Sequence, residues 1–266
     1  MRELLDEELE RYSRHVILED FGADAQGRLL ESSVLIVGAG GLGSPVALYL
    51  AAAGVGTIGI VDDDAVDLSN LQRQIIHTTA DVGTPKALSA EAKMRAINPT
   101  LTLHAHQMRV NAGNIADLIA PYDLVIDGAD NFTTKFLIND ACVLAKKPFV
   151  HGGILRFTGQ AISVRPHSSA CYACLYDAPP PPESVPTCSS AGVLGAIAGM
   201  LGTIQAAEAI KILTGVGEPL FNRMLSFDAK TMRFREIRFQ KNPDCRVCGQ
   251  KGITALTDYA EASCDL

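Results

Sequence analysis

The chain has 266 residues and a formal net charge of −7 at pH 7. This length suits one large α/β domain or two small ones, and it is enough to bury a sizeable core. The acidic balance, without a dense cluster of lysine and arginine, excludes a general nucleic-acid-binding protein. The first twenty residues are charged throughout, so no secretory signal is visible and a cytoplasmic location is expected.

Two helices are expected before the first strand. Residues 3–20 have a helical period, with acidic residues early and Arg14 among the later basic ones, and a second helix is expected over 23–31. Tyr12 and His15 have the character of packing residues. Both helices precede the first strand, so they are additions to the minimal nucleotide-binding fold.

A glycine-rich segment follows. Residues 34–37 are apolar and mostly β-branched, and Gly38, Gly40 and Gly43 come directly after them. The pattern predicts a buried parallel strand, a tight turn at Gly38, close approach of Gly40 to a pyrophosphate, and close strand–helix packing at Gly43. The N–H groups at the start of the next helix, 44–53, would face the anion. A glycine turn that binds nothing is the alternative.

The next strand, 57–61, ends in Asp62, at the distance where a Rossmann unit places an acid on ribose hydroxyls. This fits NAD and ATP equally. Residues 63–74 read as a loop at the carboxyl ends of the strands, where open α/β sheets bind ligands. Lys86 falls in the first turn of a helix that ends near 98. A lysine there opposes the helix dipole, which is a hint that Lys86 binds a ligand; a solvated lysine is the alternative.

The remaining pattern predicts an α/β fold with a Rossmann-like, doubly wound and mostly parallel sheet. Helices are expected over 112–120 and 132–146, and Asn131 is expected to cap the second of them. The apolar stretch 191–213 reads as a buried or subunit-contact helix because charged and polar residues interrupt it, so no membrane association is expected. The expected strands are 101–108, 123–126 and 149–150, followed by antiparallel hairpins over 151–166 and over 224–227 with 232–239.

Two CxxC pairs, some seventy residues apart, stand beside extended segments; they are Cys171 with Cys174 and Cys245 with Cys248. Four thiolates in two such pairs predict a closed tetrahedral zinc site, which is structural because no coordination position stays open. A redox-active CxxC is the alternative.

Cys188 follows a proline-rich segment, 178–186, that must form an exposed loop, and it precedes the apolar helix. A helix N-terminus lowers a thiol pKa, so Cys188 is a candidate for chemistry, and an inert thiol is the alternative. Cys142 is expected in the core and Cys264 in a disordered tail.

Several motifs follow one another along the chain: GAGGLG (38–43), SNLQRQ (69–74), VGTPK (82–86), DGADN (127–131), TCSSAGV (187–193) and the two CxxC pairs. With these motifs in this order, the chain resembles the MoeB/ThiF/HesA adenylyltransferases, bacterial relatives of ubiquitin-activating enzymes. The resemblance spans residues 10–249 and, within the family, is closest to the enzymes that activate the small subunit of molybdopterin synthase. It implies ATP-dependent adenylation of the C-terminal glycine of a small ubiquitin-like sulfur carrier that ends in Gly-Gly.

The resemblance also implies roles for particular residues. Gly41 would lie at the phosphates, Asp62 at the ribose, and Asp130 at Mg²⁺. The triphosphate would be bound by Asn70, Arg73 and Lys86. Arg14 would enter the ATP site of a neighbouring subunit, which implies a homodimer. Cys188 matches a loop cysteine that bonds to the carrier in some members only.

The expected organisation is a single adenylation domain over 1–249, with N-terminal helices (3–31), a nucleotide-binding core (33–150), an antiparallel, zinc-binding part (151–249) and a flexible tail (250–266). The chain ends soon after the second CxxC, so a separate protein is expected to donate sulfur. Two alternatives stay open. An NAD-dependent oxidoreductase would need only the glycine turn and Asp62, and a non-catalytic nucleotide sensor would not need Asp130.

Overall fold

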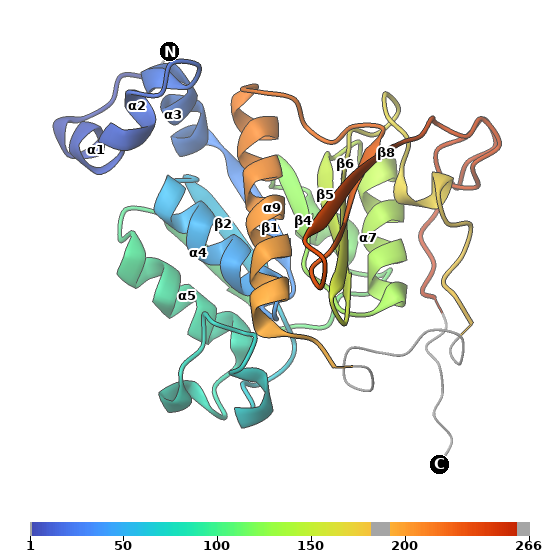
Figure 1. The fold of residues 1–266 in the computed structure, drawn as a ribbon, viewed down its shortest axis with the longest axis horizontal. Coiled ribbons are helices and arrows are strands. Elements are labelled where there is room, and N and C mark those ends of the chain that lie inside the picture. The colour runs from blue at the N-terminus through green and yellow to red at the C-terminus, as the bar shows by residue number, and fades with distance from the viewer. Residues whose placement is uncertain (1, 182–191, 260–266) are drawn as a thin grey trace.

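The structure is a computed structural model that describes residues 2–181 and 192–259. Its centre is an eight-stranded sheet in the order β3-β2-β1-β4-β5-β6-β7-β8 (Figure 1). The strands are β1 (Ser33–Val37), β2 (Thr57–Val61), β3 (Thr102–His106), β4 (Leu124–Asp127), β5 (Phe149–Leu155), β6 (Thr158–Val164), β7 (Arg223–Asp228) and β8 (Arg233–Arg238).

Helices cover both faces of the parallel part of the sheet. Val34 and Ile36 of β1 belong to a core with α3, α4, α5 and α9, whereas Leu35 and Val37 belong to a core with α6 and α7. Because both faces are buried, the strand is apolar at every one of these positions. The doubly wound sheet predicted from the sequence is confirmed. The α-helices are α1 (Asp6–Arg11), α2 (Ser13–Val16), α3 (Gly22–Glu31), α4 (Gly43–Ala53), α5 (Lys86–Ile97), α6 (Ile115–Ile119), α7 (Phe132–Leu144) and α9 (Gly195–Thr214).

The antiparallel strands are added through β5. Its residues Phe149 to His151 pair with β4 in parallel, and the same strand continues to Leu155 while pairing antiparallel with β6. The short strand 149–150 and the hairpin 151–166, expected separately, therefore share one long strand. The hairpin of β7 and β8 completes the sheet, as predicted.

The first expected helix is broken at Tyr12, so three helices precede the sheet instead of two. Tyr12 has φ −102° and ψ 16°, and it separates α1 from α2. Its ring is buried against Gly54, and its hydroxyl accepts a hydrogen bond of 2.8 Å from Asn98 Nδ2. A continuous amphipathic period does not reveal this tertiary anchor.

Helix α9 is long and apolar enough to cross a membrane by length and composition alone, and 44% of that window is buried inside the fold. It packs on α4 and β5, and Figure 1 shows it lying along one face of the sheet. Close packing depends on small residues, because a Cβ added to Gly202 would lie 2.4 Å from Pro45 Cγ. Part of this helix is therefore buried in the fold, and the subunit-contact role that the sequence also allowed stays a prediction.

The segment from residue 250 packs onto α6 and α7 as far as Tyr259, where a flexible tail had been expected. Ile253, Leu256 and Tyr259 contact the core beside α7. Asp258 Oδ1 also accepts a 2.7 Å hydrogen bond from the N–H of Ala112. Three apolar side chains and one hydrogen bond are too sparse to give a periodic signal in the sequence.

Candidate functional site

The glycine turn after β1 has the backbone that its sequence predicts. Gly38 has φ +96°, a conformation that favours glycine. A Cβ at Gly43 would lie 1.8 Å from the carbonyl oxygen of Gly38, so only glycine lets α4 begin here. At Gly40 the nearest atom to an added Cβ is Gln74 Nε2, at 3.7 Å. The turn is therefore tight at its two ends and open in its middle.

Free donors line this turn. Among the described residues, the N–H groups of Gly40, Gly41, Leu42 and Gly43 donate no hydrogen bond. Gly40 and Gly41 are partly exposed. N–H groups at a helix start bind anions, because they are unpaired and the helix dipole is positive there. The hydroxyl of Ser44, in the first turn of α4, is buried and also unpartnered. This donor set fits a phosphate group.

Asp62 lies where β2 ends, beside the turn. Its Oδ2 accepts the N–H of Ala39 at 2.8 Å and its Oδ1 accepts the N–H of Asp64 at 3.0 Å. Burial raises the pKa of Asp62, although the positive charge of Lys86 opposes the shift. The carboxylate therefore holds one side of the turn and keeps lone pairs for a ligand hydroxyl.

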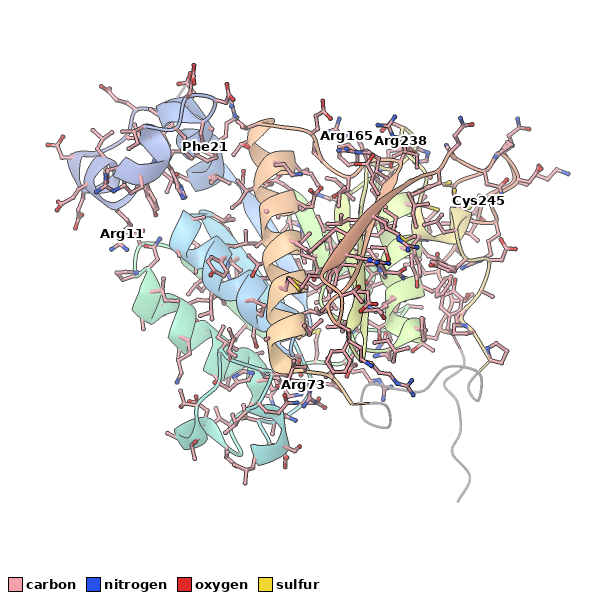
Figure 2. All side chains as sticks on the ribbon, viewed as in Figure 1. Arg11, Phe21, Arg73, Arg165, Arg238 and Cys245 are labelled. Carbon is pink, nitrogen blue, oxygen red and sulfur yellow. The ribbon has the colours of Figure 1, made fainter. Side chains whose placement is uncertain are left out.

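Arg73 lies directly over the turn. A Cβ at Gly41 would be 3.5 Å from Arg73 Cγ. Arg73 Nη1 donates to the carbonyl of Ser69 at 3.0 Å, and Figure 2 shows the residue at the lower end of α9. Asn70, three residues earlier, closes a short turn by accepting the N–H of Asp67 at 3.1 Å. The loop that was expected to bind the triphosphate is thus placed at the glycine turn.

Lys86 is the first residue of α5, and its side chain is buried with 7% of its surface exposed. Its Nζ donates to Asp64 Oδ2 at 2.6 Å, and Asp64 is 65% exposed. The N–H of Asp64 in turn bonds Asp62. Lys86 therefore reaches the turn through a chain of two acids.

Asp130 stands in a second turn, after β4. The N–H of Gly128 donates to the carbonyl of Val37 at 2.8 Å, and a Cβ at Gly38 would lie 2.8 Å from the carbonyl oxygen of Gly128. The two turns are thus in contact. Asp130 is exposed, and it has no hydrogen bond or ion pair to any described residue. Asn131 caps α7 as predicted, accepting the N–H of Thr134 at 2.8 Å.

Arg14 does not lie at this turn. It is exposed on α2, two residues after Tyr12, which packs on Gly54 at the far end of α4. An 11-residue helix separates Gly54 from the glycine turn, a rise of about 16 Å. Arg14 is therefore remote from the turn of its own chain. Cys188 lies outside the described residues.

Sequence reasoning missed two buried histidines beside the turns. His77 bonds the carbonyl of Ala39 through Nε2, at 3.0 Å, and Ser89 Oγ through Nδ1, at 2.8 Å. His151 Nδ1 bonds Asp127 Oδ2 at 2.6 Å. Burial is the first cause that lowers the pKa of each histidine. A single histidine gives no spacing signal, so only the structure identifies them.

A third group that the sequence did not reveal lies behind the second turn. Lys135 Nζ pairs with Asp127 at 3.1 Å and also donates to the carbonyl of Gly152 at 2.6 Å. The N–H of Ala129 donates to Asp127 Oδ1 at 3.0 Å. Asp127 therefore fixes the backbone that leads to Asp130. The available signal was a lysine directly before the apolar run 136–138.

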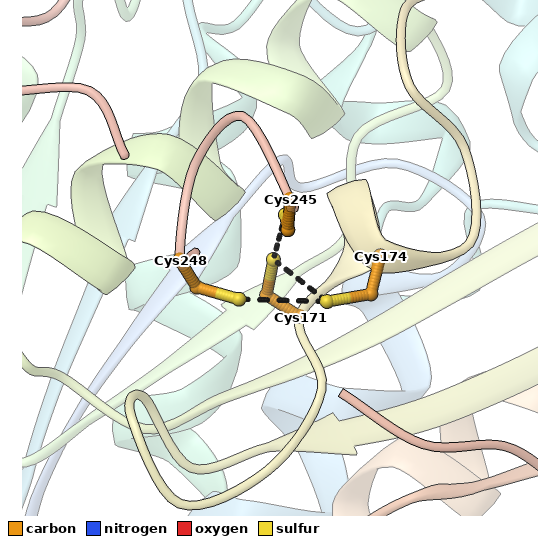
Figure 3. Close-up of side chains that lie close together, drawn as sticks. All are labelled: Cys171, Cys174, Cys245 and Cys248. Atoms are coloured by element: carbon orange, nitrogen blue, oxygen red, sulfur yellow. Dashed lines mark hydrogen bonds between the residues drawn. The ribbon is translucent and has the colours of Figure 1, made fainter. Parts of the chain in front are cut away.

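The four CxxC cysteines come together, as predicted (Figure 3). All four sulfur atoms lie within 4.8 Å of one another. The Sγ atoms of Cys171 and Cys174 are 3.9 Å apart, those of Cys171 and Cys245 3.7 Å, and those of Cys174 and Cys248 3.4 Å. A tetrahedron with zinc–sulfur bonds of about 2.3 Å has sulfur atoms about 3.8 Å apart, so the cluster fits that ion.

Comparisons with known proteins place this chain among related sequences. The ThiF family model matches residues 12–247. The chain is 48% identical to the SAMP-activating enzyme E1 of Haloferax volcanii, covering 96% of this chain and 95% of the relative. It is 47% identical to the sulfur carrier protein adenylyltransferase of Thermus thermophilus, with 98% of each chain covered. A probable adenylyltransferase/sulfurtransferase MoeZ of Mycobacterium tuberculosis is 50% identical, and the match covers 96% of this chain and 65% of MoeZ.

Solved structures have the same fold. E. coli MccB superposes with a TM-score of 0.81 at 20% identity, covering 97% of this chain and 77% of MccB. A structure of E. coli MccB with ATP gives a TM-score of 0.79 at 22% identity, covering 90% of this chain and 73% of that one. The resemblance stated from the sequence motifs is confirmed: this chain belongs to the ThiF family.

Proposed function

We propose that this protein uses ATP to adenylate the C-terminal glycine carboxylate of a small ubiquitin-like sulfur carrier, releasing pyrophosphate. The observation that carries the proposal is the row of free N–H groups at Gly40 to Gly43 with Arg73 directly over it. The names of the relatives from Haloferax and Thermus support the same reaction and the same class of partner.

The chemistry needs this arrangement. A carboxylate must approach an anionic α-phosphate, and two like charges about 4 Å apart repel by about 4 kcal/mol at an effective dielectric near 20. Preorganised donors and cations offset that repulsion. In the proposal, Arg73, Lys86 and the turn N–H groups are the positive elements that act on the phosphates. A hydride-transfer enzyme has no need for these cations.

Each residue has a role in the proposal. Gly41 contributes an N–H to the phosphates, and Asp62 accepts from the ribose hydroxyls. Asn70, Arg73 and Lys86 bind the triphosphate. Asp130 would hold the Mg²⁺ that accompanies ATP, since a free, exposed carboxylate next to the phosphate turn is a ligand that Mg²⁺ prefers. Bound magnesium would neutralise phosphate charge.

Arg14 supports a homodimer in this proposal. Its remoteness from the turn of its own chain leaves action across a subunit interface as its route to a phosphate. The surface around it is apolar enough to be an interface, because Ile17 is 70% exposed and Leu18 is 54% exposed. The dimer would complete two sites, each with an arginine from the other subunit.

We propose zinc as the ion of the four-cysteine cluster. The cluster joins the segment after β6 to the segment after β8, so its role is structural. The N–H of Asn242 also donates to Cys174 Sγ at 3.4 Å, and such contacts stabilise a thiolate ligand. Reduced thiols agree with a cytoplasmic location, which is part of the proposal.

The biosynthetic pathway is the most specific part of the proposal. We place the enzyme in molybdenum cofactor biosynthesis, with sulfur supplied by a separate protein, and we assign Cys188 a covalent role toward the carrier. Co-purification of the carrier from the source organism would test the pathway, because the small Gly-Gly protein that binds identifies the product.

The test of function is pyrophosphate–ATP exchange with a Gly-Gly-ended carrier. We expect exchange that depends on the carrier and disappears when its last glycine is removed. We also expect Arg73→Ala and Asp130→Asn to lose exchange while the melting temperature stays unchanged. Tight binding of NAD without exchange would favour an oxidoreductase, and ATP binding without exchange would favour a nucleotide sensor.

A further inference from the structure

His77 makes two hydrogen bonds that fix which ring nitrogen carries its proton. The side chain is buried, and burial lowers its pKa, so the ring is neutral at pH 7. A carbonyl oxygen only accepts, so the N–H is on Nε2, which donates to Ala39. Nδ1 therefore accepts from the hydroxyl of Ser89. The three groups form an ordered chain from α5 to the glycine turn.

The hydrogen bond from His77 to the carbonyl of Ala39 also sets the direction of the N–H of Gly40. No peptide bond of the described residues is cis. In a trans peptide the C=O of one residue and the N–H of the next lie in one plane and point in opposite directions. His77 holds the C=O of Ala39 toward the interior, so the N–H of Gly40 points outward. That N–H is one of the unpaired donors of the turn.

The N–H of Ala39 is held by a side chain as well. The N–H of Ala39 donates to Asp62 at 2.8 Å, so both peptide groups of Ala39 are held by side chains. Ser89 lies one turn after Lys86 on α5. His77 therefore also joins the turn to the helix that carries Lys86.

We propose that His77 is a positioning residue for ATP, which aims the N–H of Gly40 at a phosphate by holding the carbonyl of Ala39. This inference rests on the proposed function. It concerns the phosphates, because unpaired N–H groups at a helix start bind anions.

Two substitutions separate this role from simple support of the fold. In His77→Gln the amide nitrogen reaches the position of Nε2 and can still donate to Ala39, whereas in His77→Asn the shorter side chain cannot. Both replace a buried ring by an amide, so both are expected to lower the melting temperature. Only His77→Asn frees the Gly40 peptide to rotate.

The experiment measures ATP affinity, exchange rate and inhibition of exchange by adenosine for both variants and for the wild type. We expect His77→Asn to weaken ATP binding about tenfold, the effect of about one hydrogen bond, with adenosine inhibition unchanged. His77→Gln should stay within about twofold of wild type for ATP.

Equal loss of ATP and adenosine affinity in His77→Asn would overturn the inference, because it would show general damage to the site. Equal ATP affinity in the two variants would also overturn it. Wild-type protein without carrier-dependent exchange would refute the proposed function instead, so the two failures are distinguishable.

Discussion

Asp127 and Lys135 form an ion pair of 3.1 Å in which the two side chains are 1% and 7% exposed. Lys135 uses its remaining hydrogen-bonding capacity on the carbonyl of Gly152, and Asp127 also accepts from His151. Every charged atom of this group is paired. The group lies directly behind the turn that carries Asp130, so it stabilises the backbone on which the proposed magnesium ligand stands.

Removal of one partner of this pair is expected to be costly. Lys135→Met leaves the buried carboxylate of Asp127 without its cation, and we expect a loss of about 3 to 5 kcal/mol in the free energy of unfolding. Denaturant unfolding measures it. Arg95→Ala is the control, since Arg95 pairs with Glu91 at the surface and should cost less than about 1 kcal/mol. A Lys135→Met variant as stable as the Arg95 variant would contradict the prediction.

The sequence predicted the architecture well and the supporting groups poorly. The run from Val34 to Gly43 predicts its own structure, because a buried strand and a tight turn each restrict the residues that fit. The cysteine pairs are equally specific. His77 and Lys135 gave no such signal, since their roles depend on Ala39 and Asp127, which are distant in the chain and close only after folding. The break at Tyr12 was missed for the same reason.

Stability is expected to fall below about pH 6.5. The pKa values of His77 and His151 are lowered in the fold from 6.5, first by burial. At a pH between the folded-state pKa and 6.5, the unfolded chain binds more protons than the folded chain. The stability that the two neutral histidines contribute is therefore complete above about pH 6.5, and it decreases as the pH falls toward their folded-state pKa values. Each unit of difference is worth about 1.4 kcal/mol.

Urea unfolding at about pH 7.5 and about pH 5.5 measures this dependence. Asp81, Lys86 and Lys93 also act on His77, so the comparison is made between variants. His77→Gln lacks one of the two titrating rings, and it should lose less stability than wild type between the two pH values. A variant with the same loss as wild type would show that His77 does not titrate in this window.

Metal removal is expected to destabilise the fold. Cys245→Ser removes one of four thiolates whose sulfur atoms lie within 4.8 Å of one another. Such a variant should lose bound zinc and melt at a lower temperature, because metal binding energy contributes to folding. Metal analysis and calorimetry measure the two effects. Cys264→Ser is the control and should keep both. Full zinc content and an unchanged melting temperature in Cys245→Ser would contradict a structural metal.

Two glycines of the turn should respond differently to alanine: one substitution should lower stability, and the other should lower ATP affinity. In Gly43→Ala the new Cβ would lie 1.8 Å from the backbone oxygen of Gly38, and backbone cannot move aside as a flexible side chain does. We expect a loss of several kcal/mol in the free energy of unfolding, about the size of a severe overpacking defect. Denaturant unfolding measures it.

In Gly40→Ala the nearest atom to the new Cβ is 3.7 Å away, an ordinary contact, so stability should change by less than about 1 kcal/mol. The methyl group nevertheless stands beside the N–H that His77 aims outward, where a phosphate must approach the backbone. ATP affinity should therefore fall while the fold persists. If Gly40→Ala bound ATP as wild type does, the phosphate would have to lie elsewhere along the turn, and the free N–H groups of Gly41 and Leu42 would become its donors.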